Sequence, residues 1–353
     1  MPTKPKPSTD RGRVWLALLV LYLVWGSTYL GIAIAVESIP PFLMAAARFG
    51  SAGTVLLGWS LLRARGSFVA PSRREWRDSI IVGTLLLGGG MGMVAYGEQT
   101  VPSGITALLV AMMPVWVGIF GRTFLGERLP RLAGVGIVVG FVGVAILAAP
   151  TILGGTGALD PLGLVALIIS PIAWSLGSLF ASHRATLPRQ PLVATGVQMV
   201  SGGVVLAIMG GLTGDFGRFD PGAISGESIV AFAYLTVIGS LLAFTAYGWL
   251  MRVAPLPLIA TYAYINPVVA VILGAFVRHE SVDPRTLVAG AVIIGAVALI
   301  VTSRGRMTAP RLRTSGAPSP APATARSGAG GPPGSPGRSR PGSAYGADSS
   351  LRR

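Results

Sequence analysis

Ten long apolar stretches, separated by short polar or Pro/Gly-rich breaks, occupy the sequence from Val14 to Thr302. A hydrocarbon core about 30 Å thick needs about 20 apolar residues per helical crossing. Lipid offers no partner to backbone polar groups, so such stretches cross it as helices. The sequence therefore predicts an all-α integral membrane protein with ten transmembrane helices. The first five expected spans are Val14 to Val36, Pro41 to Leu62, Ser79 to Gln99, Ser103 to Leu125, and Arg131 to Ala149. The second five are Pro161 to Ser182, Pro191 to Gly211, Ser228 to Met251, Pro257 to Val277, and Thr286 to Thr302.

The composition excludes most soluble and enzymatic classes. Charged residues make up only 12% of the chain, against about a quarter in soluble proteins. There is no cysteine, which excludes disulfides and thiol nucleophiles. The chain has two histidines, His183 and His279, which leave little for zinc chemistry. No nucleophile with a base and no pair of buried carboxylates can be assembled. We expect no catalytic residue, no metal site and no cofactor.

The positive charges indicate a membrane topology. The net charge is +15, but Lys and Arg lie between the apolar blocks and in the tail, without a basic folded face, so we expect no nucleic-acid partner. Basic loops stay in the cytoplasm, and only three arginines fall in the expected outer loops: Arg218, Arg278 and Arg285. This predicts a multi-pass protein of a bacterial inner membrane with both termini cytoplasmic. The expected partners are the lipid bilayer and a small-molecule solute, and nothing in the sequence indicates an oligomeric state.

Four segments follow from this pattern. Residues 1–13 form a cytoplasmic N-terminal segment, 14–150 a first five-helix repeat, 151–303 a second five-helix repeat, and 304–353 a basic tail. The tail is rich in Pro, Gly and Ser and cannot bury enough apolar surface to order itself. We expect it to be a disordered cytoplasmic tail.

The two halves resemble each other. Ala107 to Glu127 aligns without gaps on Ala260 to Glu280, which pairs Pro114 with Pro267 and Glu127 with Glu280. A second alignment pairs Pro41 with Pro191 and sets Arg48 opposite Gln198, and Trp25 corresponds to Trp174. Five is an odd number, so the second repeat enters the membrane with opposite orientation, and such inverted repeats permit alternating access. A non-transporting membrane scaffold and, less favoured, a membrane enzyme stay open as alternatives.

At these residues the sequence resembles the EamA-type permeases of the drug/metabolite transporter superfamily, from Val14 to Thr302. The matching pieces include VWGSTYLGI at Val24 to Ile32, the VPSGITALLVAMMPVW stretch from Val101, and AWSLGS at Ala173 to Ser178. The resemblance implies two inverted five-helix repeats, a central cavity, and export of amino acids, other metabolites or toxic compounds. The second half departs from the family pattern, with RHESVDP in place of a Gly-Glu pair.

Eight residues are candidates for the substrate path: Trp25, Tyr29, Arg48, Glu98, Trp174, Gln198, Tyr262 and Asn266. Arg48 lies deep in a span, where it either lines the cavity as an anion-binding cation or serves helix packing. Glu98 is either a buried carboxylate able to carry a proton or a solvated helix-end group.

The aromatic and polar candidates have equally plain alternatives. Trp25, Tyr29 and Trp174 form either a cavity wall or part of the interfacial belt. Tyr262 and Asn266 serve either a substrate site or interhelical hydrogen bonding. Pro114 and Pro267 interrupt equivalent helices and are candidate hinges. Glu127 and Glu280, in short loops, fit salt bridges or helix caps better than substrate contacts.

Overall fold

The computed structural model describes residues 9–64, 69–127, 130–153, 158–254, 256–259 and 261–308, and every regular element in these ranges is a helix. All of them belong to one compact unit, Met1–Pro310. The first half comprises α1 (Thr9–Ala35), α2 (Pro41–Ala64), α3 (Arg73–Gly83), η1 (Thr84–Gly92), α4 (Met93–Gly97), α5 (Ser103–Val110), α6 (Met113–Leu125) and α7 (Arg131–Leu153). The second comprises α8 (Pro161–His183), α9 (Pro191–Leu212), α10 (Asp215–Arg218), η2 (Pro221–Ala223), α11 (Gly226–Tyr234), η3 (Leu235–Leu242), α12 (Ala243–Val253), α13 (Leu256–Ile259), α14 (Tyr262–Arg278) and α15 (Pro284–Thr308).

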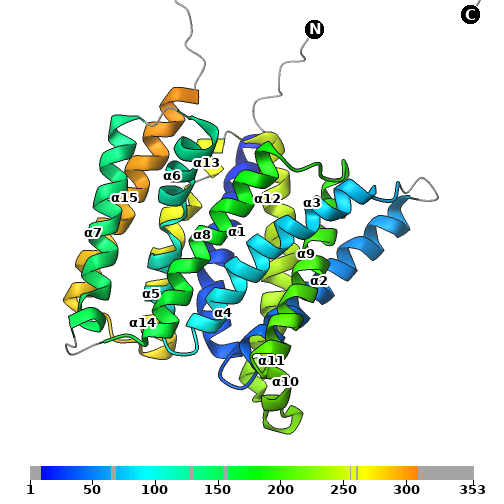
Figure 1. The fold of residues 1–353 in the computed structure, drawn as a ribbon, viewed down its shortest axis with the longest axis horizontal. Coiled ribbons are helices and arrows are strands. Elements are labelled where there is room, and N and C mark those ends of the chain that lie inside the picture. Colours follow the sequence, from blue (N-terminus) through cyan, green and yellow to red (C-terminus); the bar gives the residue numbers. More distant parts are fainter. Residues whose placement is uncertain are drawn as a thin grey trace, which may run out of the picture. The chain divides into compact units, whose positions relative to one another are not determined.

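These elements make ten crossings. Nine helices within the described ranges are long and apolar enough to span a membrane, and α14 is a shorter apolar helix preceded by the short α13. In Figure 1, α1 begins and α15 ends at the upper edge, whereas α7 ends and α8 begins at the lower edge. The two halves therefore run through the fold in opposite directions.

Helices at equivalent positions of the two halves pack on each other. The α2 helix lies along α9, and α7 lies along α15 at the left edge of Figure 1. The α1 helix packs on α14, and α8 correspondingly packs on α5 and α6. The α2–α9 contact is made backbone to backbone: a Cβ on Gly53 would lie 2.8 Å from the Gly196 carbonyl oxygen, and one on Gly203 would lie 2.9 Å from the Gly50 nitrogen. Only glycine permits so close an approach.

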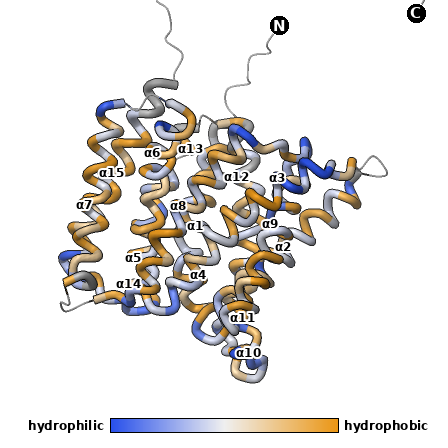
Figure 2. The backbone as a smooth tube through the Cα atoms, viewed as in Figure 1, coloured by the Kyte–Doolittle hydropathy of each residue, from blue (hydrophilic) through white to orange (hydrophobic). Residues whose placement is uncertain are grey.

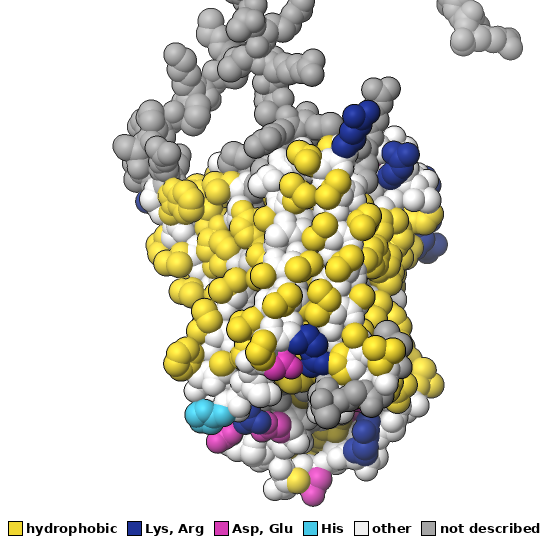
Figure 3. Space-filling model, turned by 90° about the vertical axis from the view of Figure 1, so that its left-hand side faces the viewer, with side chains coloured by type: hydrophobic (Ala, Val, Ile, Leu, Met, Phe, Trp, Pro, Cys, Tyr) yellow, Lys and Arg dark blue, Asp and Glu magenta, His cyan; other side chains and the backbone are white. Residues whose placement is uncertain are grey.

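The surface fits a bilayer. Figure 2 shows apolar residues along the lengths of the helices and polar residues at their ends. Figure 3 shows the same pattern on the face that carries α7 and α15, where hydrophobic side chains cover the middle and most charged side chains lie toward the two ends. A water-soluble protein rarely exposes so wide an apolar patch.

Several predicted boundaries need correction. The first helix begins at Thr9 rather than Val14, inside the predicted N-terminal segment 1–13, and α7 ends at Leu153, beyond the predicted repeat boundary at residue 150. The third span begins at Arg73 rather than Ser79, because Ser72 and Glu75 form a capping box: the Ser72 hydroxyl accepts from the Glu75 N–H at 3.3 Å, and the Glu75 carboxylate accepts from the Ser72 N–H at 2.7 Å. The last helix continues to Thr308, beyond the expected start of the tail at residue 304. The rest of the predicted tail lies outside the described residues.

Two wide helical segments interrupt spans three and eight. Both η1 and η3 are π-helices, and they directly precede α4 and α12. The Ala-Tyr-Gly sequences at Ala95 and Ala246 align these two spans, so the π-helices lie at equivalent positions of the repeats. Such segments are rare and frequently lie at functional sites.

The two candidate hinge prolines differ. Pro114 is the second residue of α6, directly after a break at Ala111 and Met112, as expected when a proline ring clashes with the carbonyl group four residues earlier, at the end of α5. Pro267 lies inside α14, which continues through it, and the interruption precedes Tyr262. The prolines are equivalent in sequence, but the breaks are not.

Candidate substrate cavity

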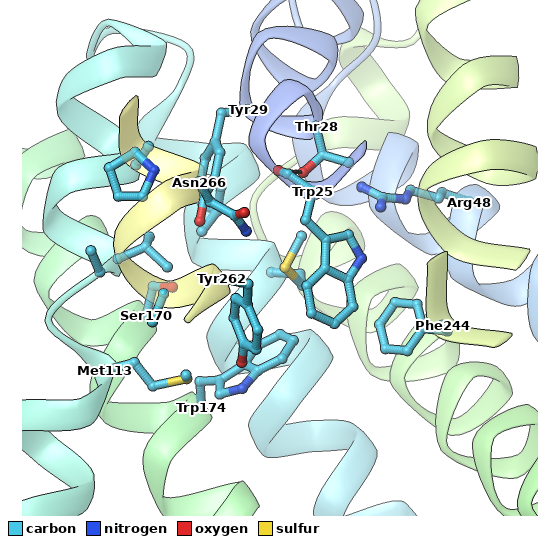
Figure 4. Close-up of a pocket in the computed structure, with 17 residues that line it drawn as sticks. Trp25, Thr28, Tyr29, Arg48, Met113, Ser170, Trp174, Phe244, Tyr262 and Asn266 are labelled. Atoms are coloured by element: carbon cyan, nitrogen blue, oxygen red, sulfur yellow. Dashed lines mark hydrogen bonds between the residues drawn. The ribbon is translucent and has the colours of Figure 1, made fainter. Parts of the chain in front are cut away.

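A cavity lies between the two halves and is drawn in Figure 4. Its walls come from α1, α2, η1 and α4 to α6 of the first half and from α8, α12 and α14 of the second. The space open to water measures about 90 Å³. That volume holds a few ordered water molecules or one end of a small solute.

An aromatic cluster around Trp25 forms one wall. The Trp25 ring lies edge-on to Phe244 and Tyr262, with centroid distances of 5.6 and 5.1 Å, and is tilted against Tyr247 at 5.3 Å. Edge-on and tilted arrangements are those that aromatic quadrupoles favour. Because α1, α12 and α14 each contribute, the wall joins both halves. Figure 4 shows Tyr262 and Trp174 together on the lower side of the cavity.

Arg48 of α2 points into the cavity from the side opposite Asn266 (Figure 4). Its side chain is 2% exposed. The guanidinium Nε donates to the Ser240 hydroxyl at 3.0 Å, and that hydroxyl donates to the Leu235 carbonyl at 3.1 Å. Both partners belong to the π-helix η3, so the wide turn positions the acceptor that holds the cation. The arrangement combines the two interpretations of Arg48, because the residue lines the cavity and also ties α2 to η3.

Asn266 supplies a free acceptor. It is 6% exposed, and its Oδ1 atom is buried with no hydrogen-bond partner among the described residues. A buried amide oxygen without a partner costs about 1–3 kcal/mol. Since Asn266 lines the cavity, a donor group of a bound solute or water would relieve that cost.

Six of the eight path candidates line this cavity: Trp25, Tyr29, Arg48, Trp174, Tyr262 and Asn266. Gln198 does not, because α9 packs on α2 and α3 away from the cavity and the Gln198 backbone carbonyl lies against Gly83. Of the hinge candidates, Pro267 lines the cavity and Pro114 does not. The repeat is thus visible in the sequence, but the cavity does not use its two copies equally.

Glu98 lines a second cavity of about 290 Å³. This one is polar and lies where α1, α4 and α14 end and α5 begins, near the lower edge of Figure 1. Glu37 and Arg278 form an ion pair in its wall. Glu98 itself is 5% exposed, so in this structure it is not a solvated helix-end group.

Several residues that line the main cavity or hold Arg48 were missed at the sequence level. Thr28, Ser170 and Phe244 line the main cavity, and Ser240 holds Arg48. Small hydroxyl residues in apolar spans mostly bond their own helix, as Thr28 does to the Trp25 carbonyl at 2.6 Å, so they carry no distinguishing signal. Phe244 could have been found from the Ala-Tyr-Gly alignment, because it lies just before the second copy.

The fold and this cavity define a class: a polytopic membrane protein with a small polar-aromatic cavity between two halves of opposite orientation, which is the architecture of secondary transporters. The chain belongs to the EamA-like transporter family, whose model matches residues 13–149 and again residues 161–302. Family membership and the helices together confirm the predicted fold of ten transmembrane helices in two inverted five-helix repeats. They also make the chain a membrane transporter rather than an enzyme.

Individual relatives of the chain are also named transporters. The chain is 39% identical over 289 residues to YedA of Escherichia coli K12, named an uncharacterized inner membrane transporter, and the match covers 82% of this chain and 90% of YedA. It is 23% identical to the uncharacterized transporter YvbV of Bacillus subtilis, covering 82% and 92%. A solved crystal structure at 22% identity superposes with a TM-score of 0.57 over 84% of this chain and 99% of the other. That likeness concerns the fold alone.

Proposed function

We propose that the protein exports small organic metabolites, such as amino acids or related compounds, or drugs, by alternating access in a bacterial inner membrane. The observation that carries this proposal is the cavity itself, whose walls come from both halves and which holds a buried cation, Arg48, opposite a free acceptor, Asn266. A zwitterionic solute presents a carboxylate and an ammonium group, which match these two partners. The aromatic wall suits an apolar side chain between them.

The two repeats, 14–150 and 151–303, are the proposed moving halves. Exchanging their conformations would close the cavity on one side and open it on the other. The similarity to YedA, named an inner membrane transporter, supports the inner membrane as the location, and the basic loops support the placement of both termini in the cytoplasm.

A metabolite export screen tests this function. Cells that produce the protein are compared with cells that produce a Trp25→Ala variant at equal membrane level, and extracellular metabolites are quantified. Export of a defined set of small solutes by the intact protein, reduced in the variant, is expected. Identical extracellular profiles in both strains, together with no flux of amino acids in reconstituted vesicles, would favour the scaffold alternative.

A further inference from the structure

Glu98 differs from every other carboxylate around the second cavity. Its two carboxylate oxygens are buried, and neither has a hydrogen-bond partner among the residues that the structure describes. Glu280 nearby accepts from the Ser103 N–H at 3.0 Å and from the Gly104 N–H at 3.2 Å, and Glu37 is paired with Arg278. Asp160, at the start of α8, accepts from the Gly163 N–H at 2.6 Å. Only Glu98 in this group lacks a donor that would compensate its charge.

An ionised carboxylate in such a setting is expensive, whereas the protonated acid loses much less on leaving water. The second cavity, which Glu98 lines, is polar and lies beside the buried carboxyl group, so it offers water a route to Glu98. Within the described residues, no group of three His, Cys, Asp or Glu side chains is arranged to hold a metal ion. The ligand that this chemistry fits is therefore a proton.

Glu98 also lies within electrostatic range of both cavities. Val94, one helical turn before Glu98, lines the main cavity, while Glu98 and Glu280 line the second. An ionised Glu98 would be repelled by Glu280 and attracted by Arg48. The charged and titratable groups that face it from the surrounding elements are Tyr29, Glu37, Arg48, Asp160, Arg278 and Glu280. His279, between the last two, is exposed. Arg48 is the positive charge of this set that lines the main cavity.

We propose that Glu98 is a proton-binding site, reached by water from the second cavity and linked electrostatically to Arg48 in the substrate cavity. Resting on the proposed transport function, this makes Glu98 the group through which proton binding influences solute binding. When Glu98 takes up a proton from water, Arg48 loses a nearby counter-charge and is freer to attract an anionic group. When Glu98 releases it, the carboxylate competes for the same cation.

The proton itself is the probe. The purified full chain in lipid nanodiscs is titrated while the carbonyl stretch of protonated carboxylic acids is followed by infrared spectroscopy. We expect a protonated-acid band that persists at neutral pH, is lost in Glu98→Gln, and stays in Glu227→Gln, the same change at an exposed glutamate that lines neither cavity. Glu98→Asp keeps a carboxyl group and should keep a band, which separates loss of the acid from loss of folding. In D2O buffer the band should shift promptly, since the cavity admits water.

The electrostatic link between Glu98 and Arg48 is tested by a separate variant. Arg48→Gln removes the positive charge that favours ionised Glu98, so the band should persist to higher pH than in the unmodified protein. An absent band at neutral pH, a band that survives in Glu98→Gln, or one that does not exchange in D2O would overturn the proton site. An unmoved titration in Arg48→Gln would overturn the link. None of these readings needs a transported solute, so they stand apart from the outcome of the export screen.

Discussion

Glu280, in the loop after α14, caps α5 of the other half: its carboxylate accepts from the Ser103 backbone N–H at 3.0 Å and from the Ser103 hydroxyl at 2.8 Å. The interpretation of Glu280 as a helix cap is thereby confirmed. The negative charge lies at a helix N-terminus, where free N–H groups and the helix dipole favour it. The carboxylate also lies against Gly274, where a Cβ would collide with Oε2. One loop glutamate thus fastens the two repeats together at the lower edge of the fold.

Removing this cap should destabilise the protein. Glu280→Ala is expected to lower the free energy of unfolding by about 1–2 kcal/mol, the usual cost of a lost cap. Ser103→Ala removes only the hydroxyl donor and should cost less. The two changes share an interaction, so their combined effect should fall short of the sum by about 0.5 kcal/mol or more. Denaturation of the purified single and double variants measures the three free energies of unfolding. Strict additivity would show that the contact between the Ser103 hydroxyl and the Glu280 carboxylate contributes nothing to stability.

At the C-terminal ends of α6 and α14, two substitutions are expected to change stability in opposite directions. Gly126 and His279 occupy equivalent C-cap positions with φ of 66° and 53°, and each cap N–H bonds the glycine carbonyl of the preceding turn, Gly121 or Gly274. A side chain in this left-handed region costs about 1 kcal/mol. His279→Gly should therefore stabilise the protein by about that amount, and Gly126→Ala should destabilise it similarly. Thermal unfolding in detergent tests the pair, and shifts in the same direction would contradict it.

The glycine contact between α2 and α9 offers a matched control on one helix. Gly53→Ala places a methyl group against the Gly196 carbonyl and the Val200 nitrogen, both 2.8 Å from the new Cβ, and should cost about 1–3 kcal/mol. Gly58→Ala meets nothing within 4 Å and should stabilise α2 by about 0.5–1 kcal/mol. Unfolding midpoints of the two variants are compared. Equal effects would mean that the helices do not pack through these backbones.

Substitutions of Arg48 distinguish a role in solute binding from a role in helix packing. If it binds an anionic group of the solute, Arg48→Gln should weaken binding of such solutes by about ten- to a hundredfold, and Arg48→Lys should rescue only part of the loss, because an ammonium lacks the guanidinium fork. Solute affinity is measured on monodisperse protein, using solutes found in the export screen. If Arg48 only holds η3, both variants would yield less folded protein with unchanged affinity in what remains.

Topology can be tested in this cysteine-free chain. The basic loops predict that Ala70 faces the cytoplasm and Gly222 the opposite side, and both residues are exposed. An impermeant thiol reagent added outside intact cells should label Gly222→Cys and leave Ala70→Cys unlabelled until the cells are opened. The reverse pattern would invert the predicted orientation.

Much of the fold could be predicted because apolar length is a strong signal. The spans from Pro41, Arg131, Pro161 and Pro191 begin where the sequence places them, since a proline or charge directly precedes or opens each apolar run. The start at Arg73 was missed because hydropathy does not register a capping box. The break at Ala111 was placed at Pro114, because a proline disturbs the residues before it rather than its own position.

The site was harder to predict than the spans. Aromatic and charged residues deep in apolar runs are conspicuous, and Trp25 and Arg48 were found this way. Asn266 was found because the first repeat has the apolar Met113 at the equivalent position. Gln198 was chosen by its pairing with Arg48, but a cavity formed in one conformation of an inverted repeat does not treat the two copies alike. Ser240 was invisible because only the π-helix brings its hydroxyl toward α2.

The two π-helices, η1 and η3, make spans three and eight tolerant of a single-residue deletion. Each π turn contains about one residue more than an α turn, so a single deletion within Thr84–Gly92 could be absorbed by a return to α-helical spacing, without breaking the span. Residues on the two sides of the deletion would then keep their relative orientation, because a π turn carries its extra residue over the same rotation as an α turn. The same deletion in an α-helical part of a span would turn one side by about 100° relative to the other, the angle of one α-helical residue. Val94, which follows η1, would therefore stay in the cavity wall after a deletion within η1. In these two segments a span can change its length without turning its side chains to another face.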